Sequence, residues 1–148
     1  METTWTALFG EELLTKDSVQ PTAKVLADKK VVGIYFSAHW CPPCRGFTPV
    51  LSTTYEELKE EHPDVEIVFV SSDSDAASFD EYYGEMPFVA LPFANREQKS
   101  LLSEKFQVFG IPTLVFVDYK GEVITKDGRQ VIADAEGDVE EIYTYLVT

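Results

Sequence analysis

The sequence predicts an α/β fold in which a central mixed β-sheet is sandwiched between α-helices. Short runs of β-branched and aromatic residues alternate along the chain with segments whose apolar residues recur every three or four positions. The run at 31–37 is apolar almost without alternation, which is typical of a strand buried on both faces. A Tyr-Lys-Gly turn at 119–121 predicts a closing antiparallel hairpin, so the sheet should be mixed.

The elements are expected to follow one another without a linker or an internal repeat. Residues 1–20 are weakly patterned, and the apolar pairs at 8–9 and 13–14 are expected in a short strand or a packed turn. Pro21 is expected to open a short helix to Ala27, because proline is tolerated in the first turn of a helix. The later expected strands lie at 31–37, 65–70, 113–117 and 122–125. A helix is expected at about 43–60, and another from Ser74 or Asp75 to Tyr83, which Gly84 ends. Two further helices are expected: one with Leu101, Leu102 and Phe106, capped by Asn95 with Gln98, and a last one with Val139, Ile142, Tyr143 and Leu146 on one face.

Length and charge exclude several classes of function. The chain has 148 residues, enough to bury a core, and we expect one domain over 1–148. The 26 acidic residues outnumber the 12 basic ones, which gives a formal net charge of −14. Such a chain lacks the basic face that nucleic acid binding needs, and an anionic membrane would repel it. With no signal sequence or membrane-spanning run in view, we expect a monomer in the cytoplasm or the nucleus.

The only two cysteines, Cys41 and Cys44, lie where the strand at 31–37 passes into a helix. A sulfur at a helix N-terminus faces unpaired N–H groups, which can lower its pKa from about 8.5 to about 7 or below. Cys44 follows one helical turn later on the same side, and Pro42 and Pro43 limit how that turn adjusts. The spacing therefore predicts a reducible disulfide in which Cys41 attacks a substrate disulfide and Cys44 resolves the mixed disulfide.

Other uses of the two cysteines fit the sequence less well. A structural zinc site needs four ligands, and only His39 and His62 remain as further soft donors. Covalent haem attachment needs a histidine where Arg45 stands. A structural disulfide across so small a loop would constrain little of the unfolded chain. We therefore expect no metal and no cofactor, and we expect Trp40 to shield the sulfurs or to fill the core.

The motif Trp-Cys-Pro-Pro-Cys-Arg at 40–45 resembles the active-site motif of the tryparedoxin and nucleoredoxin branch of the thioredoxin superfamily. The resemblance continues through Val-Phe-Val-Ser-Ser-Asp at 68–73, Met-Pro-Phe-Val-Ala-Leu-Pro-Phe at 86–93 and Gly-Ile-Pro-Thr-Leu at 110–114. It covers roughly residues 8–135 in the expected order and implies a thioredoxin-like fold. Ordinary thioredoxins usually carry Gly-Pro between the cysteines, so the Pro-Pro pair is discriminating.

The resemblance also implies roles outside the cysteine motif. The Ile111–Pro112 peptide is expected to be cis and to face the cysteines, with the backbone of Ile111 exposed for pairing with an extended partner chain. Tyr35 stands where thioredoxins have a buried aspartate, so the proton acceptor is unassigned. Asp73 is a candidate acceptor, although its place in the sequence favours an exposed carboxylate.

Two arginines are further candidates for the site. Arg45 follows Cys44 and is expected either to contact the thiolate or a partner or to be an ordinary solvated side chain. Arg129 resembles a basic position near the partner site of tryparedoxins, with a plain surface side chain as the alternative.

The function implied by the resemblance is thiol–disulfide exchange with proteins. Electrons would come from a low-molecular-weight dithiol (trypanothione or glutathione) or from a reductase, and would pass to protein disulfides such as those of peroxiredoxins. A tryparedoxin-type Trp is absent around 72–74, and Glu-Glu-Ile-Tyr stands at 140–143 in place of a Phe-Pro-Trp segment. These departures favour a nucleoredoxin or a diverged tryparedoxin-like protein, and they leave the electron donor open. The alternative function is that of a nucleoredoxin-like, redox-sensitive binding module that regulates a signalling partner.

Overall fold

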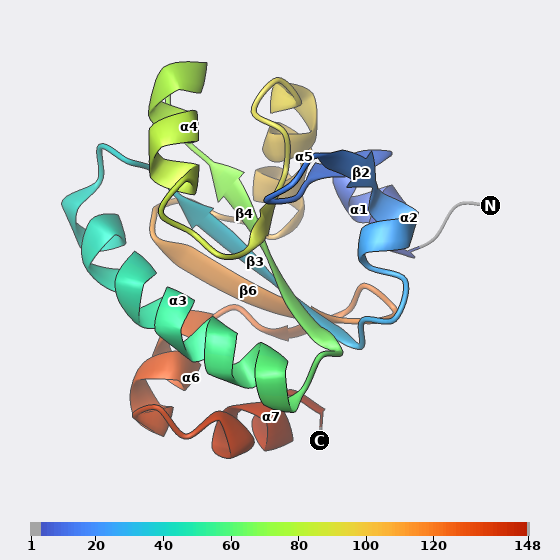
Figure 1. Cartoon of the computed structure of the whole chain (residues 1–148), viewed down its shortest axis with the longest axis vertical. Helices are drawn as coiled ribbons and strands as arrows, with labels where there is room; N and C mark the ends of the chain where they lie inside the picture. Colours follow the sequence, from blue (N-terminus) through green and yellow to red (C-terminus); the bar gives the residue numbers. More distant parts are fainter. Residues whose placement is uncertain (1–3, 148) are drawn as a thin grey trace.

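A mixed sheet of seven strands runs through the computed structural model, which describes residues 4–147 (Figure 1). The strand order is β2-β1-β5-β4-β3-β6-β7. Its centre is formed by β3 (Val31–Ser37) and β4 (Val65–Ser71), which are parallel, and by β6 (Thr113–Asp118), which is antiparallel to β3. The expected mixed sheet between helices is therefore confirmed. The shorter strands are β1 (Glu12–Leu14), β2 (Val19–Pro21), β5 (Val89–Ala90) and β7 (Val123–Thr125).

The helices cover both faces of this sheet. They are α1 (Thr4–Phe9), α2 (Thr22–Val25), α3 (Pro42–Glu61), α4 (Ala76–Tyr83), α5 (Arg96–Lys105), α6 (Gly128–Ala135) and α7 (Val139–Val147). Alternate residues of β3 point to opposite faces: Val31 and Tyr35 pack with α3, α4, α6 and α7, whereas Val32 and Ile34 pack with α1 and α5 (Figure 1). Both faces of β3 are thus buried, as its continuous apolar run predicts.

The N-terminal segment differs in part from its expectation. Trp5, Leu8 and Phe9 lie in helix α1, not in a strand or a turn, and their spacing places them together against the sheet. Residues 13–14 do lie in a strand, β1, which pairs with β2 in an antiparallel hairpin that is not among the expected elements. The short helix expected from Pro21 runs only over Thr22–Val25. Residues 1–3 lie outside the described part of the chain.

Helix caps and one helix depend on tertiary contacts. The Asp75 side chain accepts the N–H of Ser78 and caps α4, as expected. Asn95 makes no side-chain cap bond, so that expectation is wrong; the Gln98 amide instead donates to the Leu8 carbonyl and ties α5 to α1. Helix α6 is not among the expected elements, and it begins at a glycine, which is a poor helix former. A Cβ at Gly128 would lie 2.7 Å from the Leu114 carbonyl oxygen, so only glycine fits there.

Within residues 4–147, no helix combines the length and the apolar character needed to cross a bilayer. The longest, α3, carries several charged residues along its exposed side. Its N-terminus lies just beyond the carboxyl end of β3, which is the edge of a sheet where ligand and reaction sites of α/β proteins occur. The fold therefore brings Cys41 to that edge.

Candidate active site

Cys41 and Cys44 form a disulfide at the N-terminus of α3, with their Cα atoms 5.2 Å apart. Cys41 is the N-cap residue, and its Sγ accepts the backbone N–H of Cys44 at 3.3 Å. Pro42 follows at the start of the helix, where its missing N–H costs no hydrogen bond. Both cysteines are buried. A thiolate at Cys41 would be stabilised by the same N–H group and by the positive end of the helix dipole.

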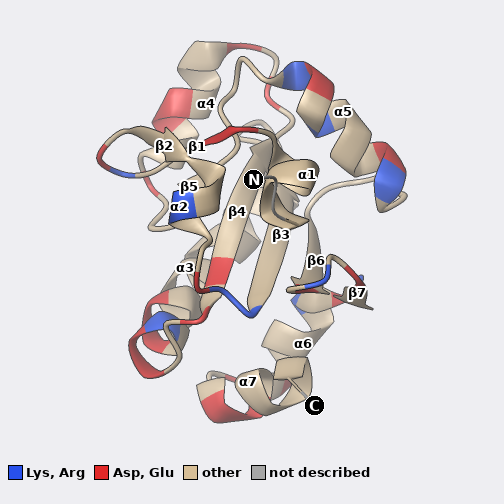
Figure 2. Ribbon diagram, turned by 90° about the vertical axis from the view of Figure 1, so that its right-hand side faces the viewer, with Lys and Arg blue, Asp and Glu red and all other residues tan. Residues whose placement is uncertain are grey.

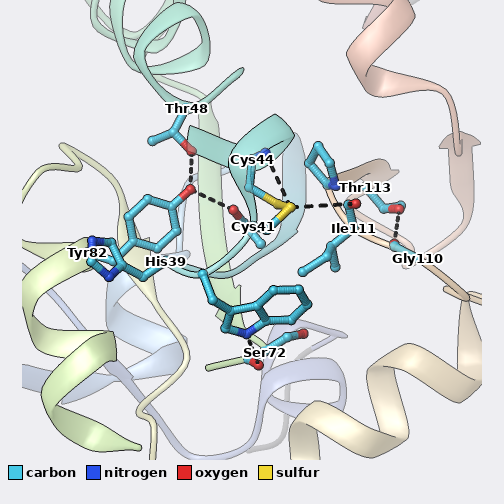
Figure 3. The surroundings of a disulfide bond; sticks show 12 residues. His39, Cys41, Cys44, Thr48, Ser72, Tyr82, Gly110, Ile111 and Thr113 are labelled. Carbon is cyan, nitrogen blue, oxygen red and sulfur yellow. Dashed lines mark hydrogen bonds between the residues drawn. A yellow bond between two sulfur atoms is a disulfide. The ribbon is translucent and has the colours of Figure 1, made fainter. Parts of the chain in front are cut away.

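The loop that enters β6 lies against the disulfide. The carbonyl oxygen of Ile111 is 3.9 Å from Cys41 Sγ, and the half-buried Ile111 side chain packs against the cluster that the two cysteines form with Ala38 (Figure 3). The Ile111–Pro112 peptide bond is cis, as the resemblance implies. Pro43 is exposed on the first turn of α3, whereas Pro112 is buried. Chain segments about 70 residues apart in sequence thus meet at the sulfurs.

Trp40 lies on the surface beside this disulfide and does not fill the core. Its side chain is 62% exposed, and its indole N–H donates to the Ser72 carbonyl at 3.1 Å (Figure 3). The core alternative is therefore wrong for this residue, because one hydrogen bond holds the ring while most of its surface faces solvent. Shielding of the sulfurs by the ring stays a prediction. The exposed ring is available for contact with a partner.

A chain of buried hydroxyls lies beneath the first turns of α3. Thr48 Oγ1 is 2.6 Å from the hydroxyls of both Tyr35 and Tyr82, and the Tyr82 hydroxyl is 2.8 Å from Ser37 Oγ. The Tyr35 hydroxyl also donates to the carbonyl of Cys44 at 3.4 Å. Burial raises the pKa of Tyr35 above its ordinary value, so its hydroxyl stays neutral and offers no anionic acceptor for a proton. The sequence pattern does not reveal this chain of hydroxyls; its one signal is Tyr35 in place of an aspartate.

Asp73 is buried, contrary to the expectation of an exposed carboxylate. Only 5% of its surface is accessible. Its oxygens accept the backbone N–H of His39 and the hydroxyl of Ser71, each at 2.8 Å. Because these bonds reach the loop that precedes Cys41, Asp73 anchors the approach to the disulfide. Its proposed role as a proton acceptor stays a prediction.

The two candidate arginines differ in their surroundings. Arg45 is exposed on α3. Arg129 donates from its guanidinium to the Pro112 carbonyl at 3.3 Å and lies 5.6 Å from the centre of the Phe47 ring. It lines an open pocket of about 380 Å³ next to the loop at 111–113. Arg129 therefore belongs to the surroundings of the site, although no bond joins it to a sulfur among the described residues.

The two histidines lie in different surroundings. The His39 ring packs against Tyr82 with centroids 5.6 Å apart, and His62 stacks on Tyr143 at the far end of α3. In the part of the chain that the structure describes, no three His, Cys, Asp or Glu side chains are grouped to hold a metal ion.

Comparison with known proteins identifies the family. A family model described as thioredoxin-like matches residues 28–123. The chain belongs to the thioredoxin-like family. Within this family it groups with tryparedoxins and nucleoredoxins: a tryparedoxin from Trypanosoma brucei brucei is 46% identical over 110 residues, which cover 73% of this chain and 76% of that protein. Human nucleoredoxin is 47% identical over 105 residues, 71% of this chain.

Solved tryparedoxins have the same thioredoxin-like fold. Tryparedoxin I from Crithidia fasciculata superposes with a TM-score of 0.84 at 38% identity and covers 91% of this chain and 94% of that one. A tryparedoxin II in complex with glutathionylspermidine superposes with a TM-score of 0.83 at 35% identity, covering 90% and 94%. The chain spans about a quarter of the length of the nucleoredoxins that it matches, since the aligned part is 24% of the human protein.

Proposed function

We propose that this protein is a thiol–disulfide oxidoreductase that reduces protein disulfides through Cys41 and Cys44. The observation that carries the proposal is the position of Cys41 Sγ. It caps α3, accepts the N–H of Cys44 at 3.3 Å and lies 3.9 Å from the Ile111 carbonyl. A sulfur so placed has a donor that favours its ionised form, a neighbouring thiol for resolution and a backbone acceptor beside it. Membership of the thioredoxin-like family supports the same chemistry.

The reaction proceeds by two exchanges. The Cys41 thiolate attacks one sulfur of the partner disulfide, so a Cys41–partner bond forms, the partner disulfide breaks and one partner thiolate leaves. Deprotonated Cys44 then attacks Cys41 Sγ, which forms the Cys41–Cys44 disulfide and releases the second partner thiolate. Two electrons pass to the partner, whose thiolates take up two protons. A donor thiol must afterwards reduce the Cys41–Cys44 disulfide.

The surrounding residues have supporting roles in this proposal. Pro42 and Pro43 stiffen the turn between the sulfurs, and Trp40 offers an apolar contact for the partner. The backbone of Ile111 pairs with an extended partner segment that carries the disulfide, with Pro112 completing that wall. Arg129 contributes positive charge beside this segment, because it is held against the loop at 111–113.

The donor and acceptors are proposed from the relatives. One tryparedoxin II has been solved with glutathionylspermidine, which supports a low-molecular-weight thiol such as trypanothione or glutathione as donor, with a reductase as the alternative. We assign peroxiredoxins as the class of acceptor. Residues 1–148 would act as one domain and as a monomer, in the cytoplasm or the nucleus.

Insulin-disulfide reduction tests the proposal. Wild-type protein with dithiothreitol should accelerate insulin precipitation. Cys41→Ser should remove this acceleration, and Cys44→Ser should accumulate mixed disulfides visible by non-reducing electrophoresis and mass spectrometry. Retained turnover in Cys41→Ser would refute the mechanism. Trypanothione with its reductase, glutathione, and thioredoxin reductase should then be compared as donors in steady state.

A second function, redox-dependent binding of a signalling partner, is favoured by the apolar surface near the disulfide. Phe109 is 94% exposed and lies two residues before Ile111, and Trp40 is 62% exposed. Such a surface can bind a partner without turnover. Pull-downs with oxidised protein, reduced protein and a Cys41→Ser/Cys44→Ser variant separate the two functions. Capture that is the same in all three forms would exclude the redox switch.

A further inference from the structure

The end of β4 lies against the loop that leads into the disulfide. Strands β3 and β4 are parallel, so their carboxyl ends meet at one edge of the sheet. At that edge, the backbone N–H of Ser72 donates to the carbonyl of Ser37 at 2.9 Å. The position of the loop at 38–40, which precedes Cys41, therefore depends on the position of the segment at 71–73.

Two further hydrogen bonds connect the segment at 71–73 to this loop. The carbonyl of Ser72 accepts the indole N–H of Trp40 at 3.1 Å. The Asp73 carboxylate accepts the backbone N–H of His39 at 2.8 Å. Because the Trp40 side chain is 62% exposed, little packing holds its ring, and the bond to Ser72 sets how the ring lies.

Arg96, the first residue of α5, also binds the segment at 71–73. Its Nη1 donates to the carbonyl of Ser71 at 2.8 Å, and its Nε donates to the carbonyl of Phe93 at 2.5 Å. The guanidinium also lies over the Phe93 ring, 4.1 Å from its centre. One planar side chain thus joins the end of β4 to the segment before α5, a geometry that arginine provides and lysine does not.

The charge and burial of Arg96 indicate more than a surface contact. Burial lowers the pKa of its guanidinium, and the carboxylate of Asp73 acts in the opposite direction. Asp73 is itself only 5% exposed, so the two groups stabilise each other's charge where water gives little screening. The Nη2 of Arg96 is buried and has no hydrogen-bond partner among residues 4–147. A buried donor without a partner lowers stability, which favours a role for this arginine in the site rather than in the core.

We propose that Arg96 is a positioning residue for thiol–disulfide exchange at Cys41. Through the segment at 71–73 it fixes the loop at 38–40, and with that loop the exposed ring of Trp40 on which a protein substrate packs. This role rests on the proposed reduction of protein disulfides. Arg96 itself has no contact with either sulfur in the described part of the chain. Cys41 Sγ keeps its own bond to the start of α3, so Arg96 affects the binding of a protein more than the exchange itself.

Steady-state insulin reduction by an Arg96→Met variant tests this role. Methionine keeps a straight apolar side chain on the Phe93 ring but donates no hydrogen bond. The KM for insulin should rise about fivefold, whereas kcat should change less than about twofold. The rate with cystine should also change less than about twofold, because so small a substrate has little surface to pack on Trp40. Arg96→Lys keeps the charge without reaching both carbonyls, so it should raise KM at least about twofold.

A mutant cycle with Trp40 and an NMR signal separate positioning from a general loss of structure. Trp40→Ala should raise the insulin KM about fivefold, and the double variant Arg96→Met/Trp40→Ala should raise it no more than about twofold further, because both changes act through one ring. In ¹⁵N-labelled protein, the indole N–H signal of Trp40, assigned by its loss in Trp40→Ala, should shift in Arg96→Met. The indole N–H signal of the buried Trp5 should not shift and serves as an internal reference.

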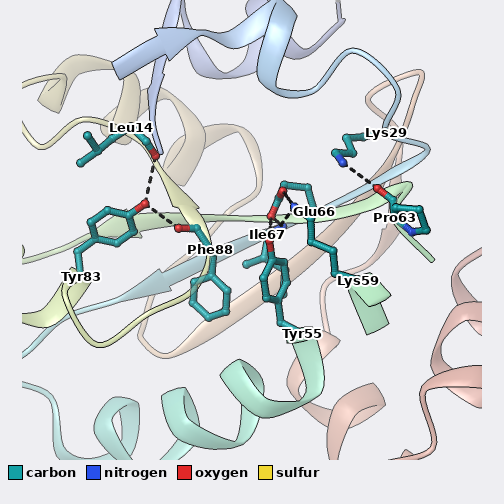
Figure 4. A network of polar contacts seen from close by, with 9 residues as sticks. All are labelled: Leu14, Lys29, Tyr55, Lys59, Pro63, Glu66, Ile67, Tyr83 and Phe88. Atoms are coloured by element: carbon teal, nitrogen blue, oxygen red, sulfur yellow. Dashed lines mark hydrogen bonds and ion pairs between the residues drawn. The ribbon is translucent and has the colours of Figure 1, made fainter. Parts of the chain in front are cut away.

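Two controls match the change in charge and the change in stability. Figure 2 shows basic positions at both ends of α5, and Lys105→Met removes the one at the end of the helix that is distant from Arg96. Lys59 binds Glu66 near the start of β4, at the end of this strand away from the disulfide (Figure 4). Lys59→Met should therefore lower stability without reaching the site. Both controls should keep the wild-type KM for insulin and the wild-type Trp40 signal.

Any of four results would overturn the positioning role: an unchanged insulin KM in Arg96→Met, an unshifted Trp40 indole signal, effects that multiply in the double variant, or the same rise of KM in either control. Circular dichroism reports folding, and Arg96→Lys takes the place of Arg96→Met if methionine prevents it. Wild-type protein that does not reduce insulin would refute the proposed function. That result differs from a wild-type protein that reduces insulin and whose KM is unchanged by Arg96→Met.

Discussion

Replacing Thr48 with valine tests whether the buried hydroxyl chain holds the first turns of α3 against β3. Valine has nearly the same shape as threonine but lacks the hydroxyl. Thr48 Oγ1 is 2.6 Å from the hydroxyls of both Tyr35 and Tyr82, and all three residues are buried. The substitution therefore removes two short hydrogen bonds from the interior without opening a large cavity.

The expected loss of stability depends on the hydrogen bonds that the hydroxyls of Tyr35 and Tyr82 keep in the variant. Tyr82 retains Ser37 at 2.8 Å, but Tyr35 retains only the long bond to the Cys44 carbonyl at 3.4 Å. A neutral hydrogen bond contributes about 0.5–1.5 kcal/mol, so two give a loss of about 2 kcal/mol in the free energy of unfolding. For a chain of this size, that loss lowers Tm by about 4–8 °C.

Urea unfolding followed by circular dichroism measures this loss. Tyr35→Phe and the double variant complete a mutant cycle, because both single changes remove the same bond. Coupling between them of about 0.5 kcal/mol or more is expected. Thr48→Ser keeps the hydroxyl and controls for the lost methyl group. A loss below about 0.5 kcal/mol in Thr48→Val, or no coupling in the cycle, would show that the chain does not hold this turn.

Three further predictions follow from buried and exposed groups, two near the site and one in the core away from it. Asp73→Ala should lower the free energy of unfolding by about 1–3 kcal/mol in urea titrations, because it leaves the His39 N–H without its acceptor. Asp73→Asn keeps an acceptor oxygen and should lower this free energy less; equal losses in the two variants would contradict the prediction. Phe109→Ser should keep stability within about 0.5 kcal/mol but raise KM for insulin and not for a small disulfide; an unchanged insulin KM would argue against a contact. Burial raises the pKa of Tyr55 and Tyr83 in the folded chain, so the unfolded chain loses these hydroxyl protons at lower pH. The free energy of unfolding should therefore fall above about pH 10. An unchanged urea midpoint between about pH 8 and pH 11 would contradict these shifts.

Much of the candidate site is readable from local sequence. The change from an unbroken apolar run to helical spacing marks the passage from β3 to α3, and it places Cys41 at a helix N-terminus. The two cysteines face each other because positions three apart lie on one side of a helix. The short elements β1, β5 and α6 were harder, since each depends on a neighbour in space more than on its own pattern. Gly128 illustrates this, because its contact with Leu114 explains why a helix begins at a poor helix former.

By itself, the sequence determined the class of fold and the position of the cysteine pair at a helix N-terminus, because both depend on residues that are neighbours along the chain. The tertiary structure decided that Asp73 is buried, that Trp40 is exposed and that Arg129 lies against the loop at 111–113. It also assembled the hydroxyl chain from separate segments. The burial of a side chain and its contacts with distant segments depend on how the helices and strands pack. A local sequence pattern therefore does not predict them.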